Sequence, residues 1–253
     1  MIRLGDVASA AGYSLVSLQS VDSTNRLALD LAQQAGANRT WVVSEVQREG
    51  RGRHGRVWES PAGNLYATLL LVAPCTVADS PKLGFVAGVA LAETLKALRV
   101  PGDVRLKWPN DVLVEGAKLA GILLEGRMIS ADKQAVAIGM GLNIASAPEI
   151  ADRRTVSLGA LGAALTREDV FRVLSEQMTA AMTTFARGAG FFSVRDAWSR
   201  LSLPPGTPIT VKVPAGEHAG RFAGIDGQGR LKLDTAAGQM TLDAGDVFVT
   251  SAG

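Results

Sequence analysis

Four short apolar segments follow one another between residues 104 and 144, with little but turns between them. They cover residues 104–108, 111–114, 119–125 and 135–144. Tight turns such as Glu115-Gly116 join segments of this kind into a meander, whereas parallel strands need long crossover connections. The chain is therefore predicted to have the α+β class, with a meander in place of a strand–helix alternation.

The flanking sequence adds strands and helices to this meander. Strands are predicted at residues 13–21, 40–46 and 64–72. Apolar residues at helical spacing after Ser23 predict a helix that Gly36 ends, and Ser80-Pro81 opens a long helix to about Leu98. Thr166 and Asp169 form a capping-box pattern at the start of a helix to about residue 186, and residues 191–201 predict one more helix.

The composition changes at Leu203-Pro204-Pro205-Gly206. Glycine turns then separate five short strands, at residues 209–213, 219–225, 230–233, 239–242 and 246–250. Short strands with turns of this kind are typical of a small β-barrel. We therefore expect two domains, a mixed α+β domain at 1–202 and a β-barrel at 203–253.

Composition narrows the class of protein. The chain has 253 residues, 47% of them hydrophobic, which is enough for a substantial core. Its net charge of +2 does not indicate a nucleic-acid binder, and its single cysteine, Cys75, excludes an intramolecular disulfide. The N-terminus lacks a signal-peptide pattern, and no segment approaches the roughly 18 apolar residues of a membrane span. A cytoplasmic protein without a membrane partner is expected.

Residues 50–55 read Gly-Arg-Gly-Arg-His-Gly and match the pattern G-x-G-x-x-G. A dinucleotide site also needs a helix directly after the loop and an acidic residue about 20 positions later. The next residues, 57–61, end in Pro61 and cannot open a helix, and position 70 is leucine. The context therefore excludes a Rossmann site.

The same loop is rich in arginine. Arg51, Arg53 and Arg56 can bind phosphate or carboxylate oxygens through paired hydrogen bonds. Only Glu49 and Glu59 are acidic nearby in the sequence. The loop is therefore expected to repel itself until an anion binds and orders it.

Five segments then occur in a specific order. They are Ser23-Thr24-Asn25, the stretch from Gln47 to Trp58, Lys107-Trp108-Pro109-Asn110-Asp111, Lys118-Leu119-Ala120-Gly121-Ile122-Leu123 and Gly139-Met140-Gly141-Leu142-Asn143. Over roughly residues 20–145 this set resembles the biotin protein ligase family. The resemblance implies a class II synthetase-like mixed sheet with helices, followed by an SH3-like barrel. Some members carry an N-terminal DNA-binding domain; only about twenty residues precede Ser23, so no DNA binding is expected.

The resemblance also implies an activity. Members activate biotin with ATP to biotinoyl-5′-AMP and pass biotin to a lysine of a biotin carboxyl carrier domain. ATP, biotin and Mg²⁺ are the implied ligands, and the protein is expected to be a monomer or a homodimer. Arg53, Asp111 and Lys118 match catalytic positions, with Asp111 as the metal ligand.

The other matched positions bind ligands in the family. Positions that contact biotin are Ser23, Thr24, Asn25 and Gln47. Loop positions around the biotin carboxylate and the adenylate phosphate are Arg51, Gly52 and Arg53, and Gly50 and Arg56 of the same loop are also expected to bind ligand. Nucleotide-side positions are Trp58, Lys107, Asn110, Asp111 and Asn143, whereas Lys118 matches the lysine near the biotin carboxylate. Gly121 fits a close backbone approach to ligand. His54 departs from the basic residue often found at its position.

Structural explanations compete with several of these roles. Ser23, Thr24 and Asn25 could simply cap a helix. Lys107 and Lys118 could form salt bridges with Asp111 or Glu125. Gly121 could mark a β-bulge.

Two other functions also stay open. A lipoate–protein ligase or octanoyltransferase would share the acyl-to-lysine chemistry, although its signature differs. A non-catalytic nucleotide- or nucleic-acid-binding module could use the basic loop and the barrel, although the low net charge weighs against it.

Overall fold

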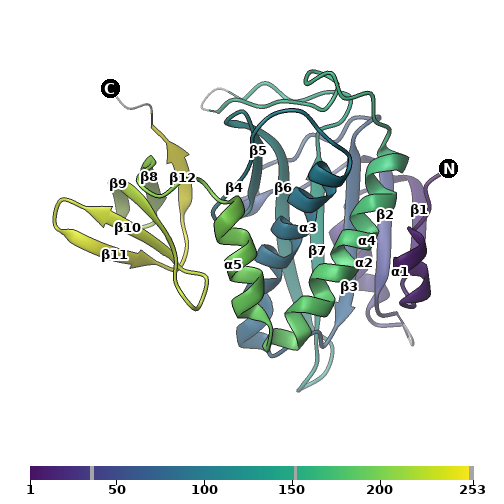
Figure 1. Cartoon of the computed structure of the whole chain (residues 1–253). Helices are drawn as coiled ribbons and strands as arrows, with labels where there is room; N and C mark the ends of the chain where they lie inside the picture. Colours follow the sequence, from purple (N-terminus) through teal and green to yellow (C-terminus); the bar gives the residue numbers. More distant parts are fainter. Residues whose placement is uncertain (35–36, 151–152, 251–253) are drawn as a thin grey trace.

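A computed structural model describes residues 1–34, 37–150 and 153–250 (Figure 1). Its larger part is a seven-stranded mixed sheet in the order β1-β2-β3-β7-β6-β5-β4. The strands are β1 Ser14–Val21, β2 Thr40–Gln47, β3 Leu65–Val72, β4 Val104–Lys107, β5 Asp111–Val114, β6 Ala117–Met128 and β7 Gln134–Leu142. Only β1 and β2 pair in parallel; the other neighbours are antiparallel, so the predicted meander is confirmed.

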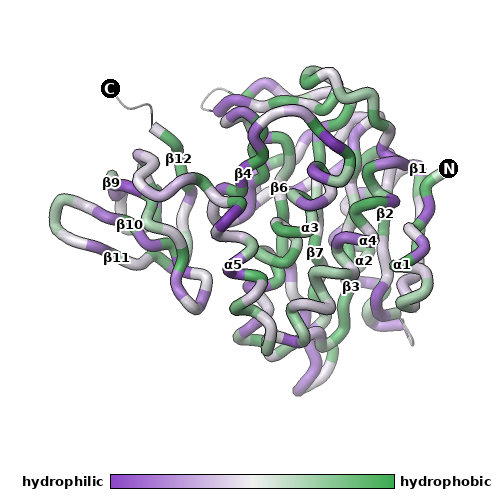
Figure 2. The backbone as a smooth tube through the Cα atoms, viewed as in Figure 1, coloured by the Kyte–Doolittle hydropathy of each residue, from purple (hydrophilic) through white to green (hydrophobic). Residues whose placement is uncertain are grey.

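Helices cover both faces of this sheet (Figure 1). Residues of β3 alternate between the faces: Leu69 packs in the core beneath α3 Leu83–Ala97 and α4 Arg167–Phe185, whereas Leu70 packs with α2 Thr24–Leu31. Figure 2 shows the resulting hydrophobic stretches along the strands and α3. The sheet is thus buried on both sides and gives the strand ends a rigid support.

The helix ends agree with the sequence signals in most places. Thr166 and Asp169 form the predicted capping box of α4, and α5 spans Phe191–Leu201 as expected. The long helix α3 begins later than predicted, because Pro81 lies in a preceding 3₁₀ helix, Val77–Lys82. The residue expected to end α2, Gly36, lies outside the described residues. A further short helix, α1 Asp6–Ala10, precedes β1.

The C-terminal strands form a second, antiparallel sheet in the order β11-β10-β9-β8-β12. They are β8 Pro208–Val213, β9 Gly216–Ile225, β10 Leu231–Thr235, β11 Gly238–Leu242 and β12 Asp246–Val249. The first and last of these strands pair, as in the small barrel expected. Trp108 Nε1 donates a hydrogen bond to the Gly229 carbonyl at 3.0 Å, which ties this sheet to the turn between β4 and β5. The predicted α+β class, with a C-terminal β unit, is confirmed.

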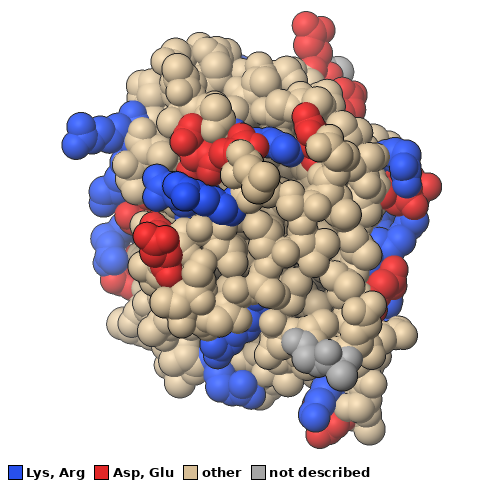
Figure 3. Space-filling model, turned by 90° about the vertical axis from the view of Figure 1, so that its right-hand side faces the viewer, with Lys and Arg blue, Asp and Glu red and all other residues tan. Residues whose placement is uncertain are grey.

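The surface on the β1 side of the molecule carries both positively and negatively charged side chains. On this face, Figure 3 shows Lys and Arg side chains in small groups beside Asp and Glu. No helix in the described part of the chain has both the length and the apolar composition needed to span a bilayer.

Candidate active site

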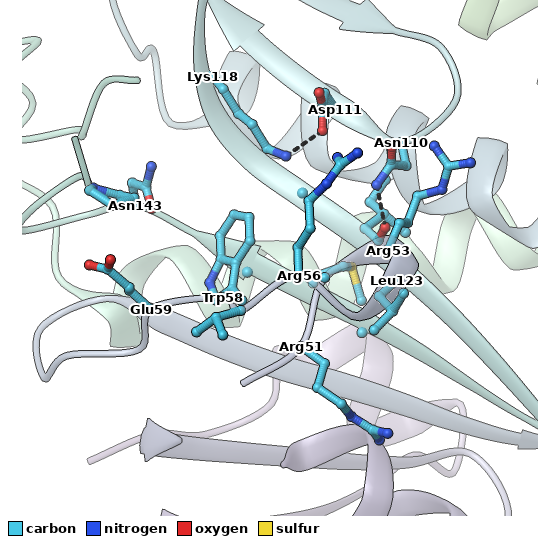
Figure 4. Close-up of a pocket in the computed structure, with 18 of the residues that line it drawn as sticks. Arg51, Arg53, Arg56, Trp58, Glu59, Asn110, Asp111, Lys118, Leu123 and Asn143 are labelled. Atoms are coloured by element: carbon cyan, nitrogen blue, oxygen red, sulfur yellow. Dashed lines mark hydrogen bonds and ion pairs between the residues drawn. The ribbon is translucent and has the colours of Figure 1, made fainter. Parts of the chain in front are cut away.

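A cavity of about 290 Å³ opens where the meander, the arginine-rich loop, the start of α2 and β12 meet (Figure 4). Its volume is near the lower end of small-molecule sites. All but one of the predicted site residues line it: Ser23, Thr24, Asn25, Gln47, Arg51, Gly52, Arg53, Arg56, Trp58, Lys107, Asn110, Asp111, Lys118, Gly121 and Asn143. Segments far apart in the sequence therefore converge on one site.

Gly50 is the exception and lies behind the lining. Its carbonyl accepts a hydrogen bond from the Trp58 backbone N–H at 2.9 Å. A Cβ at Gly50 would lie 2.3 Å from the Trp58 carbonyl oxygen, so no larger residue fits without a shift of the loop. Gly50 closes the base of the loop, and its contact with ligand stays a prediction.

Hydrogen bonds between uncharged side chains, together with one to the Glu125 carboxylate, build one half of the cavity. Gln47 Oε1 accepts from both the backbone N–H and the hydroxyl of Thr24, each at 2.9 Å. The hydroxyl of Thr68, which is fully buried, lies 2.7 Å from Asn25 Oδ1 and 2.8 Å from Thr24 Oγ1. Asn25 Nδ2 donates to Glu125 Oε2 at 2.8 Å. Each of these side chains is held by a neighbour, so this half is fixed in the absence of ligand.

Ser23 also has a structural role. Its hydroxyl accepts from the Arg26 backbone N–H at 3.4 Å and caps α2, so the capping alternative is confirmed for this residue. The side chain nevertheless lines the cavity with Thr24 and Asn25. Capping and ligand contact are therefore compatible at this junction.

The arginine-rich loop closes on itself. Gly52 N–H donates to the Arg56 carbonyl at 2.7 Å, and a β-bridge joins Arg51 to Val57. Between them His54 takes a left-handed conformation with φ of 56°, which histidine adopts more readily than most residues. No helix begins directly after the loop, since the next element is β3, which agrees with the exclusion of a Rossmann site.

Carboxylates from distant segments neutralise the loop arginines. Asp246, at the start of β12, pairs with Arg53 at 3.3 Å and with Arg56. Arg51 pairs with Glu125 of β6 at 3.2 Å. Glu49 and Glu59 were the only acidic neighbours expected for this loop, and that expectation was wrong, because residues distant in sequence, Glu125 and Asp246, are brought close by the fold.

The Asp111 carboxylate joins the two predicted lysines. Its oxygens lie 2.9 Å from Lys107 Nζ and 2.5 Å from Lys118 Nζ, so the salt-bridge alternative is confirmed for both lysines. Burial alone raises the pKa of Asp111, but the two ammonium groups outweigh it and lower this pKa to about 2. Burial lowers the pKa of Lys118, and Asp111 opposes that change. Asp111, Lys107 and Lys118 therefore form a largely buried cluster of two cations and one anion.

Trp58 lies across the meander. A Cβ at Gly141 would lie 2.5 Å from the indole ring, and one at Gly121 would lie 2.9 Å from it. Lys118 Nζ sits 5.2 Å from the ring centroid, a cation–π distance. The two glycines thus make room for the indole. Gly121 pairs with Asp111 and Gly141, and the bulge of β6 lies at Leu119, so the bulge alternative for Gly121 was wrong.

Two asparagines predicted to lie on the nucleotide side also line the cavity. Asn110 Nδ2 donates to the Ile122 carbonyl at 2.8 Å, and Asn143 Nδ2 donates to the Val156 carbonyl at 3.2 Å. These bonds orient both amides from the backbone of neighbouring segments.

Sequence reasoning missed three groups of site residues. They are Thr68 behind the neutral half, the loop residues Pro148, Ile150, Arg153 and Thr155, and the β12 residues Asp246 and Val247. Lys107 Nζ donates to the Val247 carbonyl at 2.9 Å, so the C-terminal sheet forms part of the cavity wall. A lone threonine, an irregular loop and an aspartate 193 residues from Arg53 carry no local signal.

Comparison with protein-family models agrees with this site. The model of the biotin/lipoate A/B protein ligase family matches residues 17–143, half of the chain. The model of the biotin protein ligase C terminal domain matches residues 206–249, which include β12. The description of the second model names biotin protein ligases alone.

Individual proteins are similar over nearly the whole length. A biotin–[acetyl-CoA-carboxylase] ligase of Paracoccus denitrificans is 38% identical over 241 residues, covering 91% of this chain and 98% of that protein. One from Mycobacterium tuberculosis is 36% identical, covering 96% and 93%. The structure of an Aquifex aeolicus biotin protein ligase in complex with biotin and ATP superposes with a TM-score of 0.77 at 26% identity, covering 94% and 99%. The chain belongs to the biotin protein ligase family.

Proposed function

We propose that this chain joins biotin to a lysine of a carrier protein at the expense of ATP. The observation that carries the proposal is the cavity itself, which sets a neutral, hydrogen-bonding half beside a half with excess positive charge. Six cationic and three acidic side chains line it. That combination suits a ligand with a polar ring and a carboxylate next to a nucleotide with several phosphates.

In the first step, a biotin carboxylate oxygen attacks the α-phosphorus of ATP. A new P–O bond forms, the bond to the β-phosphate oxygen breaks, and pyrophosphate leaves. Two anions must approach each other, so fixed cations lower the barrier. Arg53 and Lys118 are proposed to supply this charge, since both line the cavity and both are held by carboxylates that ligand oxygens can replace.

Magnesium is proposed to accompany ATP. Mg²⁺ usually keeps several waters and binds through one or two carboxylates together with substrate phosphates. Each Asp111 oxygen is ion-paired with one lysine and keeps a second lone pair, so Asp111 could supply such an oxygen beside Lys107 and Lys118. When bound, the ion would neutralise phosphate charge. Asp111 as its ligand remains a prediction.

In the second step, the ε-amine of the acceptor lysine attacks the acyl carbon of biotinoyl-AMP. An amide bond forms, AMP leaves with the electrons of the broken C–O bond, and the amine loses a proton. No nucleophile of the ligase is needed. Residues 50–58 are proposed to cover the adenylate and exclude water.

The acceptor is proposed to be a biotin carboxyl carrier domain, which agrees with the relatives named for acetyl-CoA carboxylase. The proposed units are residues 1–202 for catalysis and 203–253 for the C-terminal barrel. The protein is proposed to act in the cytoplasm, as a monomer or homodimer.

One assay tests the proposal. The protein is mixed with ATP, Mg²⁺ and labelled biotin, and biotinoyl-AMP is measured before and after addition of a carboxyl carrier domain. Adenylate formation followed by labelling of the carrier lysine is expected. If no adenylate forms, the proposed function is wrong.

Competition between biotin and lipoate in the same assay tests the nearest alternative function. If the protein were a lipoate ligase, lipoate would inhibit formation of the labelled adenylate more strongly than unlabelled biotin does. A nucleic-acid-binding module would instead show salt-sensitive RNA or DNA binding without ATP turnover. The mixed charges on the face in Figure 3 give no support to that alternative.

A further inference from the structure

Arg153 differs from the other cations of the cavity. Arg51, Arg53, Arg56, Lys107 and Lys118 each form an ion pair with Glu125, Asp246 or Asp111. Arg153 also lines the cavity, yet it forms no ion pair with any side chain in the described ranges. Its Nε is buried and has no hydrogen-bond partner among the described residues. A buried donor without an acceptor is costly, so a ligand that supplies one should bind there.

The backbone holds Arg153 beside the reaction site. The Lys118 N–H donates to the Arg154 carbonyl at 2.8 Å, and the Val156 N–H donates to the Lys118 carbonyl at 3.0 Å. The loop thus runs alongside β6 at Lys118. Burial is the main cause that lowers the pKa of Lys118, and the charge of Arg153 adds to it, which agrees with their proximity.

Arg153 and the loop arginines both contact side chains of β12. The Arg153 guanidinium carbon lies 5.9 Å from the centroid of the Phe248 ring, while Asp246, two residues earlier, pairs with Arg53 and Arg56. Side chains two apart on a strand point to the same side and are separated by about 7 Å. Arg153 and the loop arginines therefore flank the same side of β12, across a span that a triphosphate chain can bridge.

We propose that Arg153 binds the β- and γ-phosphates of ATP and positions pyrophosphate for departure. The inference rests on the proposed function and deepens it. A guanidinium presents paired N–H groups that match phosphate oxygens, and no carboxylate of the described residues pairs with those of Arg153. The proposal makes it a positioning residue for the leaving group.

The test compares Arg153→Ala with two controls. Arg154→Ala removes the same charge one residue away, where the side chain is exposed. Phe248→Leu removes the ring beneath Arg153 and leaves the guanidinium. The probes are biotin, AMP and α,β-methylene-ATP in equilibrium binding, with ATP in steady-state adenylation.

Arg153→Ala is expected to raise the KM for ATP and the Kd for α,β-methylene-ATP by about tenfold to a hundredfold, the usual range for a lost charge-assisted hydrogen bond. Biotin and AMP should bind as in the wild type, because neither carries a β-phosphate. Arg153→Lys should restore part of the loss, since it keeps the charge without the planar fork. Thermal unfolding of each variant reports whether the fold is intact.

Three results would overturn the inference. The KM for ATP could stay unchanged in Arg153→Ala, biotin binding could weaken in place of ATP binding, or Arg154→Ala or Phe248→Leu could reproduce the effect. A wild-type protein that forms no adenylate would instead overturn the proposed function, so the two failures are distinguishable.

Discussion

The two halves of the cavity are built from different interactions. On one side, Thr24, Asn25, Gln47 and Thr68 hold one another through neutral hydrogen bonds in buried positions. On the other side, five of the six cations are held by carboxylates, and Asp111 and Asp246 each pair with at least two of them. The neutral half has its shape before ligand arrives, whereas most cations of the charged half are paired with carboxylates of the protein itself.

This difference determines the free energy gained by ligand binding in each half. A ligand in the neutral half adds hydrogen bonds to a fixed frame, so its orientation is set in advance. A phosphate in the charged half must exchange with a carboxylate or share its cation. Its net gain is smaller than the strength of the new contact, and it depends on salt and pH.

The largest expected effect is at Asp111. Asp111→Ala leaves Lys107 and Lys118 buried beside each other without an anion. Loss of one partner from a buried ion pair costs roughly 3–5 kcal/mol of unfolding free energy. Urea denaturation measures it, with Asp30→Ala as the control, since the Asp30–Arg127 pair is exposed and should contribute at most about 1 kcal/mol. Equal losses in the two variants would contradict the distinction between buried and exposed pairs.

Acid should remove part of the same stabilisation. The pKa of Asp111 is lowered from 3.8 to about 2, so its contribution is complete above the unfolded value and is lost as the pH falls through the folded value. A shift of that size corresponds to about 2 kcal/mol. The unfolding free energies of wild type and Asp111→Asn should converge as the pH falls from 4 to 2. Parallel curves would show that Asp111 does not titrate in this window.

A smaller effect is expected in the neutral half. Thr68→Val keeps the shape of the side chain but leaves Asn25 Oδ1 without its donor, which costs about 1–2 kcal/mol of stability. Biotin binding should weaken, while the KM for ATP stays the same.

The matched control for Thr68→Val is Thr94→Val. Thr94 is equally buried and donates to the Ala90 carbonyl within α3. This variant should lose similar stability without any change in biotin affinity. If biotin bound equally well to Thr68→Val, the neutral half would not be the biotin side.

Local sequence signals were sufficient for most of the fold. The meander, the capping box at Thr166 and helix α5 all depend on contacts between residues close in the chain. The start of α3 was missed because Pro81 suits a 3₁₀ turn as well as the first turn of an α-helix.

The same distinction between local and long-range contacts applies to the site residues. Short motifs placed fifteen residues in the cavity wall, because each motif presents its side chains from a single turn or strand. The partners of those side chains could not be predicted in the same way. Asp246 meets Arg53 only after the C-terminal sheet packs on the turn at Trp108, and Thr68 looks like any residue of a buried strand.

The smallest expected effect is at Asp246, where the charged half meets the C-terminal sheet. Asp246→Asn keeps the shape of the side chain and removes the charge that holds Arg53 and Arg56. Because this carboxylate is partly exposed, stability should fall by less than about 1 kcal/mol.

If Asp246 stands in for a phosphate, the Asp246→Asn variant should bind ATP up to about fivefold more tightly than the wild type, and the gain should shrink in high salt. Asp243→Asn, at a far more exposed carboxylate that pairs with Arg230, is the control and should leave ATP binding unchanged. Weaker ATP binding in Asp246→Asn would reverse the interpretation: the carboxylate would then hold the arginines in place for the nucleotide, and the charged half would be as preformed as the neutral one.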